Sequence, residues 1–162
     1  MDMNEQGKRA HRCCFTGHRP EKLTITEAEA LLRLESAIRQ AISDGYTEFI
    51  TGMARGVDIW AGEIVIRLRD EGRPIKLICA SPFSGFEDVW NEEWQERYHR
   101  LLEEADSVEY ICPGYSRYCF QLRNEWLVNN SSRVIALWNG KPSGTANTVK
   151  YAKKQGVPCV VL

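Results

Sequence analysis

Short apolar runs alternate along this chain with longer stretches of helical periodicity. The apolar runs predict six strands, at 12–16, 48–51, 75–80, 108–112, 134–138 and 159–162. Between them, apolar residues recur every three or four positions, which predicts helices at 26–44, 57–71, 90–105, 120–130 and 144–155. Such alternation is typical of a parallel sheet that is covered by helices on both faces.

We therefore expect an α/β, Rossmann-like fold with a doubly wound, mostly parallel sheet, because right-handed crossovers place helices on both sides. The pattern does not determine the order of the strands. The length of 162 residues predicts a single domain over 1–162, with residues 1–11 as a flexible start.

Composition narrows the class of protein. Hydrophobic residues make up 43% of the chain and charged residues 27%, which is typical of a globular protein. The 21 basic and 22 acidic side chains give a net charge of -1, so no overall positive field attracts nucleic acid or an anionic membrane. The absence of a long apolar run or a secretory signal predicts a cytoplasmic protein without a membrane partner. The spacing of the six cysteines predicts neither disulfides nor a metal site.

Small and polar residues follow the first, second and fifth predicted strands, where a fold of this kind binds its ligands. Candidate binding residues in these three loops are Thr16, Gly17, His18, Arg19, Gly52, Arg55, Gly56, Asp58, Ser143, Gly144 and Thr145. Glycine lets the backbone approach a ligand, a helix start attracts an anion, and arginine adds charge-assisted hydrogen bonds. The loops therefore predict a site for a small phosphate-bearing ligand.

These residues also have structural interpretations. The glycines could simply form tight turns, and His18 could be an ordinary surface imidazole. Asp58 could do no more than stabilise the positive end of its helix. Ser143 is better explained as a helix N-cap than as a nucleophile, because no histidine is near it in the sequence. Three such loops at one rim nevertheless favour a site.

Several segments resemble the SLOG superfamily, a Rossmann-like group that contains the DprA/Smf proteins and the LOG-type nucleotide hydrolases. The similarity is carried by TGMARGVDIWAGEIV at 51–65 and by the stretch that runs from RNEW at 123 to residue 162. The opening CCFTGHRPEKL at 13–23 and the segment from SPFSGF to EEAD at 81–106 are similar to the compact YpsA-like branch. Together these segments cover most of the chain.

The resemblance implies a nucleotide or nucleotide-derived ligand held by the glycine-containing loops. It adds Arg123 and Asn124 to the candidate binding residues, although an arginine within a helix is by default solvated or salt-bridged. LOG hydrolases carry the motif PGGxGTxxE, whose glutamate participates in cleaving the N-glycosidic bond. This chain has Thr148 at the glutamate position, and threonine cannot supply the carboxylate. Glu63 and Glu125 remain as candidate substitutes, so the catalytic residues are left open.

Three functions follow from these observations. The first, which we favour, is a binding or sensor module for a nucleotide-like phosphate compound, because the rim shows no recognisable catalytic constellation. The second is a nucleotide-processing hydrolase in which His18, Asp58 or a glutamate carries the proton. The third is DprA-like binding of single-stranded DNA. The balanced charge disfavours it, although a local groove could still be formed by Arg19, Arg55, Arg123 and Lys141. No cofactor beyond the nucleotide-like ligand is expected.

The predicted helix at 90–105 is rich in aromatic residues, among them Trp90 and Trp94. These side chains are best explained as part of the hydrophobic core. A second interpretation is an interface between copies of the chain, because aromatic residues are enriched at such contacts. The sequence therefore also raises the hypothesis of a homo-oligomer.

Overall fold

The computed structural model describes residues 3–162 and the side chains of residues 7–162. At its centre is a sheet of six strands in which each pair of neighbours runs parallel. The strands are β1 (Arg12–Gly17), β2 (Glu48–Thr51), β3 (Lys76–Ser81), β4 (Ser107–Tyr110), β5 (Arg133–Leu137) and β6 (Cys159–Val161). The observed sheet confirms the predicted doubly wound α/β fold.

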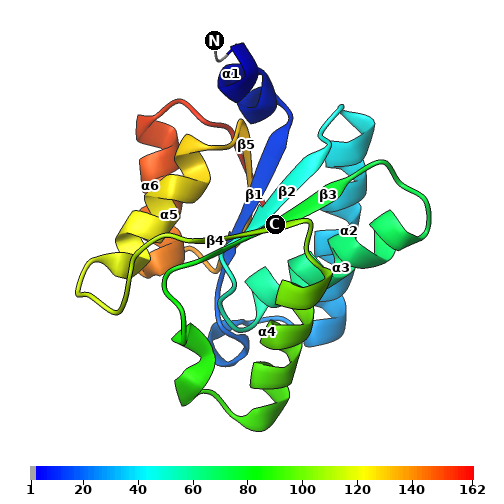
Figure 1. The fold of residues 1–162 in the computed structure, drawn as a ribbon. Coiled ribbons are helices and arrows are strands. Elements are labelled where there is room, and N and C mark those ends of the chain that lie inside the picture. Colours follow the sequence, from blue (N-terminus) through cyan, green and yellow to red (C-terminus); the bar gives the residue numbers. More distant parts are fainter. Residues whose placement is uncertain (1–2) are drawn as a thin grey trace.

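Helices cover both faces of the sheet (Figure 1). They are α1 (Met3–Ala10), α2 (Glu27–Ser43), α3 (Val57–Asp70), α4 (Glu92–Glu104), α5 (Cys119–Asn129) and α6 (Gly144–Lys154), with short 3₁₀ turns η1 (Pro20–Lys22) and η2 (Phe86–Val89). In Figure 1, α2, α3 and α4 lie on one side of the sheet, while α5 and α6 lie on the other. Among the described residues, no helix combines the length and the apolar character that crossing a lipid bilayer requires.

Two hydrophobic cores fill the space between the sheet and its helices. Cys13 and Phe15 of β1 point into the larger core on the α2–α3 side, where Phe15 stacks on Phe49 with ring centroids 6.0 Å apart. Cys14, between them, points into the smaller core under α5 and α6. Because both faces of each central strand are buried, the strands appear in the sequence as continuous apolar runs. All six cysteines are free thiols.

The observed element boundaries explain where the sequence pattern succeeded and where it failed. The predicted N-cap Thr26 is present, since its Oγ1 accepts a hydrogen bond from the amide of Glu29 at 3.1 Å. The predicted helical position of Trp90 is wrong, because Asn91 caps α4 and leaves Trp90 before the helix. Residues Met3–Ala10 form the helix α1, and the expected flexibility of residues 1–11 stays a prediction.

The strand order creates a switch point between β1 and β5. The order is β4-β3-β2-β1-β5-β6, so the chain moves outward from β1 to β4 and then returns to the other side of β1. Loops that follow β1 and β5 therefore turn toward opposite faces and leave a crevice between them. This carboxyl edge of the sheet lies at the lower end of Figure 1, opposite α1.

Candidate functional site

A cleft of about 990 Å³ opens at the carboxyl edge of the sheet. Its lining includes the predicted residues Thr16, Gly17, His18, Arg19, Arg55, Asp58, Arg123, Asn124, Ser143, Gly144 and Thr145. Gly52 and Gly56 are not in the lining, but they contact residues that are. The structure thus brings the three predicted loops and the α5 residues together around one cleft, while their role in binding stays a prediction.

Asp58 and Arg123 form a buried pair of opposite charges in the lining of the cleft. Asp58 lies in the first turn of α3, and its Oδ2 accepts a hydrogen bond from the amide of Ala54 at 3.2 Å. The second carboxylate oxygen, Oδ1, is buried and has no hydrogen-bond partner among the described residues. Arg123 donates from Nη1 to the carbonyl oxygen of Gly52 and from Nε to Oδ1 of Asn124, the latter at 2.8 Å.

Burial changes the acidity of both groups in this pair. Burial raises the pKa of Asp58 to about 6, against the opposing effects of Arg123 and of the Ala54 amide. Burial also lowers the pKa of Arg123, and the negative charge of Asp58 partly offsets that effect. Asp58 is therefore ionised at neutral pH and becomes protonated in mild acid.

Gly52 provides the space in which this pair fits. A Cβ atom at Gly52 would lie 3.0 Å from Nη1 of Arg123 and 3.0 Å from Oδ2 of Asp58. The next residue, Met53, has φ 69, a left-handed conformation that is unfavourable for a residue other than glycine. Thr51 supports the turn, because its Oγ1 donates to the Asp58 carbonyl at 2.7 Å and accepts from the Met53 amide at 3.3 Å. Gly52 thus acts through backbone geometry rather than by lining the cleft.

The loop after β1 is pressed against the start of α3. A Cβ at Gly17 would lie 2.4 Å from Cγ1 of Val57, so only glycine allows this approach. Gly56 has φ 90, and a Cβ there would lie 2.7 Å from the carbonyl oxygen of His18. The Val57 amide donates to that same oxygen at 3.4 Å. The glycines therefore fix the position of His18 relative to α3.

His18 connects the two loops at the switch point. Its Nε2 accepts a hydrogen bond from the backbone amide of Asn139 at 3.2 Å, and the side chain is buried. This bond requires an unprotonated Nε2 and so favours the neutral imidazole with its proton on Nδ1. Burial also lowers the pKa of His18, which likewise favours the neutral imidazole. His18 is therefore a neutral link between the loops after β1 and β5, rather than the surface imidazole that the sequence also allowed.

Positive side chains surround the rest of the cleft. Arg55 is held by Glu21 through two hydrogen bonds, of 3.2 and 3.1 Å, a partner that the sequence pattern did not indicate. Arg19, Lys22 and Lys141 also line the cleft, and none of them forms an ion pair within the described part of the chain. Lys22 was absent from the candidate residues, and Lys141 was named only as part of a possible groove for DNA. Their position could have been inferred from the turn and loop that adjoin Arg19 and Ser143.

The start of α6 presents backbone amides to the cleft. Ser143 is the N-cap, as predicted, since its Oγ accepts a hydrogen bond from the Ala146 amide at 3.1 Å. The amide hydrogens of Gly144 and Thr145 find no acceptor among the described residues. Thr148 is fully buried, and its hydroxyl donates to the Gly144 carbonyl at 3.0 Å. This end of α6 can accept an anion, whereas Thr148 has no free hydroxyl to offer a reaction.

The candidate substitute glutamates lie outside the cleft. Glu63 is paired with Arg97, whose Nε donates to it at 3.0 Å, and Glu125 accepts a hydrogen bond from Gln121 at 3.0 Å. Neither is in the lining, so Asp58 is the acidic residue that the cleft contains. Within the described chain, no group of three His, Cys, Asp or Glu side chains is arranged to hold a metal ion.

An apolar wall forms the remaining side of the cleft. It consists of Phe86, Val89, Trp90, Trp94 and Phe120, none of which was in the candidate set. Three come from the η2 segment and its flank, one from α4 and one from α5, so no local sequence motif marks them. Trp90 and Trp94 thus lie in the wall of the cleft, and the homo-oligomer hypothesis stays a prediction that light scattering can check.

Comparison with known proteins places the chain in a family. The model of the YpsA family, described as the YspA SLOG family, matches residues 13–159. The chain belongs to this family. The YpsA match extends from β1 to β6 and so includes each loop of the cleft. It confirms the resemblance that the sequence motifs indicated.

Similar curated proteins come from bacilli. UPF0398 protein BH1768 of Halalkalibacterium halodurans is 30% identical over 152 residues, which cover 92% of this chain and 78% of that protein. UPF0398 protein ABC2016 of Shouchella clausii is 31% identical over 152 residues, covering 88% and 81%. The SPbeta prophage-derived protein YoqJ of Bacillus subtilis is 32% identical over 141 residues, covering 76% and 82%.

Solved structures of DNA processing protein A share the fold. The protein from Helicobacter pylori, described for its binding of single-stranded DNA, has a TM-score of 0.66 at 20% identity, covering 99% of this chain and 68% of that chain. The protein from Streptococcus pneumoniae has a TM-score of 0.64 at 14% identity, covering 94% and 50%. At these identities the likeness shows a common fold.

Proposed function

We propose that this YpsA-family chain binds a small phosphate-bearing ligand of the nucleotide type in its cleft, as a binding or sensor module. The observation that carries the proposal is a local excess of positive charge. Five Arg or Lys residues line the cleft, against the single acidic residue Asp58 among the described lining residues. The whole chain has a net charge of -1, so this concentration of positive side chains is a property of the site.

The backbone supports the same proposal. The amides of Gly144 and Thr145 lie at the start of α6, where the helix dipole adds partial positive charge. Lys141 and Arg19 line the same cleft and provide full charges that can form charge-assisted hydrogen bonds with phosphate oxygens. A phosphate group matches this combination better than an uncharged ligand does.

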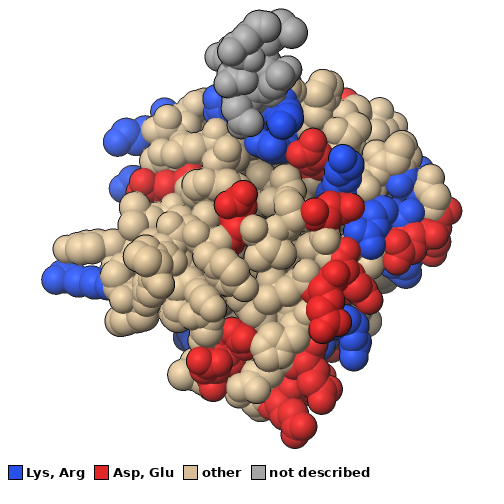
Figure 2. All heavy atoms as spheres, in the orientation of Figure 1, with Lys and Arg blue, Asp and Glu red and all other residues tan. Residues whose placement is uncertain are grey.

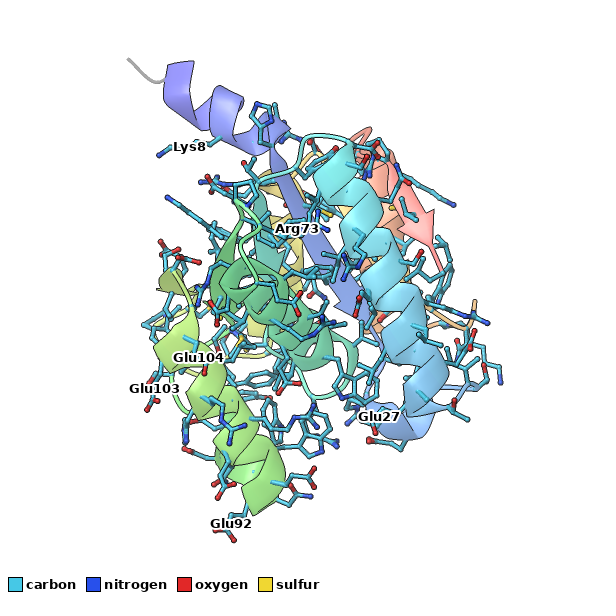
Figure 3. All side chains as sticks on the ribbon, turned by 90° about the vertical axis from the view of Figure 1, so that its right-hand side faces the viewer. Lys8, Glu27, Arg73, Glu92, Glu103 and Glu104 are labelled. Atoms are coloured by element: carbon cyan, nitrogen blue, oxygen red, sulfur yellow. The ribbon has the colours of Figure 1, made fainter. Side chains whose placement is uncertain are left out.

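Calorimetry against AMP, ADP, ADP-ribose and NAD tests the proposal, with uncharged adenosine as the comparison ligand. We expect at least one phosphate-bearing compound to bind, and the double variant Arg19→Ala/Lys141→Ala to weaken it by about tenfold or more, since each lost charged contact costs roughly 1–3 kcal/mol. Arg73→Ala is the matched control, because Arg73 is exposed and precedes β3 at the opposite edge (Figure 3). Absence of binding by the folded protein to the whole panel would contradict the proposal.

A nucleotide hydrolase is the second candidate function, and Asp58 is the observation that favours it. A carboxyl group with a pKa of about 6 in a ligand-sized cleft is suited to proton transfer near neutral pH. Chromatographic analysis of ADP-ribose and AMP after incubation with the protein tests whether either compound is hydrolysed. A hydrolase in which Asp58 carries the proton predicts product formation that Asp58→Asn abolishes.

Binding of single-stranded DNA is a third candidate, favoured by the fold shared with the Helicobacter pylori protein. The surface beside the cleft opposes it, because Glu92, Glu93, Glu103 and Glu104 are exposed along α4. Figure 2 shows acidic side chains gathered over this helix, and Figure 3 shows Glu92, Glu103 and Glu104 pointing away from the sheet. Such charges repel a polynucleotide that extends past the cleft more than a ligand that fits within it. A salt titration of oligothymidylate binding by fluorescence anisotropy is the test.

A further inference from the structure

The two ends of the cleft differ in chemistry. The loops after β1 and β5 contribute Arg19, Lys22, Lys141 and the amide-rich start of α6. The segment after β3 and the first turn of α5 contribute the aromatic wall, by which we mean Phe86, Trp90 and Phe120. A ligand that occupied the whole cleft would therefore meet positive charge at one end and apolar rings at the other.

The rings of the aromatic wall contact one another across two segments of the chain. The centroid of Phe86 lies 5.0 Å from that of Trp90 and 5.6 Å from that of Phe120. This contact joins η2, on the α4 side of the sheet, to α5 on the other side. The wall therefore joins the two helical layers along one side of the cleft.

Part of this wall remains uncovered. Phe120 is 38% exposed and the neighbouring Val89 is 90% exposed, although both line a cleft. Core packing explains the inward neighbours Trp94 and Tyr98, which are nearly inaccessible. Phe120, in the first turn of α5, also packs edge-on against Phe83 and Tyr115, with ring centroids 6.2 and 6.3 Å away, yet 38% of its surface stays open. Open aromatic surface that is continuous with a positive pocket is suited to a planar ring that carries negative charge.

The two ends of the cleft are built on different strands of the sheet. The segment with Phe86 and Trp90 follows β3, and the loop with Lys141 follows β5, with β2 and β1 between these strands. Three inter-strand spacings of roughly 4.8 Å separate the carboxyl ends of β3 and β5 by about 14 Å. A ligand that reaches from the segment after β3 to the loop after β5 must span a comparable distance, which suits a nucleotide with more than one phosphate better than a single phosphate.

We infer that the aromatic wall is a stacking subsite for the base of a nucleoside diphosphate or longer nucleotide whose phosphates lie at the loop after β5 and the start of α6. This inference rests on the proposed function and adds the class of ligand and its direction in the cleft. The base stacks against Phe120 and the adjoining rings, while Lys141 and the α6 amides hold the distal phosphate.

Calorimetry with three probes separates the two ends. ADP has both a base and a diphosphate, AMP has a shorter phosphate, and inorganic diphosphate has no base. We expect ADP to bind about tenfold tighter than either of the others, because base stacking and reach to the distal phosphate act only in ADP. Phe120→Ala should weaken the binding of ADP by about tenfold and leave the binding of inorganic diphosphate unchanged. Phe120→Tyr keeps the ring and should bind ADP like the wild type.

Tyr118→Ala is the matched control, because Tyr118 is an exposed aromatic residue two positions away that does not line the cleft. It should leave ADP binding unchanged, and thermal unfolding shows whether each variant is folded. The stacking subsite would be overturned if Phe120→Ala weakened the binding of ADP and of diphosphate equally. It would also be overturned if the wild type bound ADP and diphosphate with equal affinity. Binding of diphosphate in that case leaves the proposed function standing. Failure of these three probes and of ADP-ribose and NAD overturns both the stacking subsite and the proposed function.

Discussion

Asp58 of α3 and Arg123 of α5 converge on Gly52 from opposite faces of the sheet. The Cβ position of Gly52 lies 3.0 Å from an oxygen of the carboxylate and 3.0 Å from a nitrogen of the guanidinium. Each charged group is buried, so each depends on the other and on the backbone of the loop after β2 for compensation. The pair therefore couples the two helical layers at the carboxyl end of β2.

The acidity of Asp58 should make stability depend on pH. Its pKa in the folded state is raised from 3.8 to about 6. At a pH between these two values, the folded chain holds a proton that the unfolded chain has released. The resulting stabilisation is fully present below pH ~4 and is lost as the pH rises through 6, by roughly 3 kcal/mol in total. Urea unfolding of wild type and Asp58→Asn from pH 4 to 7 measures it. As the pH rises, the free energy of unfolding of the wild type should fall relative to that of the variant. A difference between the two that does not change with pH would refute this explanation.

Gly52→Ala should damage both stability and binding. The new methyl group would lie 3.0 Å from Arg123 and from Asp58, so these buried groups would have to shift, which costs about 1–3 kcal/mol. Arg123 would also move away from the cleft lining, so affinity for a phosphate-bearing ligand should fall. Gly114→Ala is the control, because a Cβ there meets no atom within 4 Å. Chemical denaturation and calorimetry report the two effects, and equal behaviour of the two variants would show that the space at Gly52 is unimportant.

The link between His18 and Asn139 should break in acid. Burial lowers the pKa of His18 below its ordinary value of 6.5, so the unfolded chain binds this proton more readily than the folded chain. Its contribution to stability is therefore fully present above pH ~6.5 and is lost as the pH falls. NMR titration should give a His18 midpoint below 6.5, with the Asn139 amide shift following the same curve. In His18→Ala that amide should show no such titration; a midpoint above 6.5 would disprove the neutral link.

Thr148→Glu should not restore the hydrolysis associated with the PGGxGTxxE motif. Thr148 is fully buried, and its hydroxyl already bonds to the Gly144 carbonyl. A carboxylate at this position would be buried without a partner, which costs several kcal/mol. Thr148→Val, which keeps the shape, should cost only about 1 kcal/mol. Thermal unfolding compares the two, and a stable Thr148→Glu variant that cleaves AMP would contradict this interpretation.

Local patterns in the sequence predicted the elements of the fold and the loops of the cleft. Strands buried on both faces leave continuous apolar runs, and Thr26 and Ser143 are caps whose partners lie three residues away. Contacts between distant residues left no such signal. His18 and Asn139 are 121 positions apart, and Arg55 pairs with a glutamate 34 positions earlier. The order of the strands was equally inaccessible, because the pattern does not record which strands are neighbours.

The aromatic wall shows the same limit in another form. Phe86 and Phe120 are separated by two elements of the chain, α4 and β4, and each lies in a segment with an ordinary structural explanation. Helical periodicity assigned Trp90 to a helix, because spacing alone does not register the cap at Asn91. The apolar side of the cleft therefore became visible only when the folded chain brought these segments into contact.

The hydrogen bond from Asn139 to His18 has a kinetic consequence. Together with the fit of Gly17 against Val57 and the bond from the Asn139 side chain to the Lys22 carbonyl at 3.3 Å, it holds the anion-facing loops in a fixed arrangement. A preorganised receptor loses little conformational entropy when its ligand arrives, and it needs no slow rearrangement beforehand. Association should therefore proceed in one fast phase whose rate rises linearly with ligand concentration.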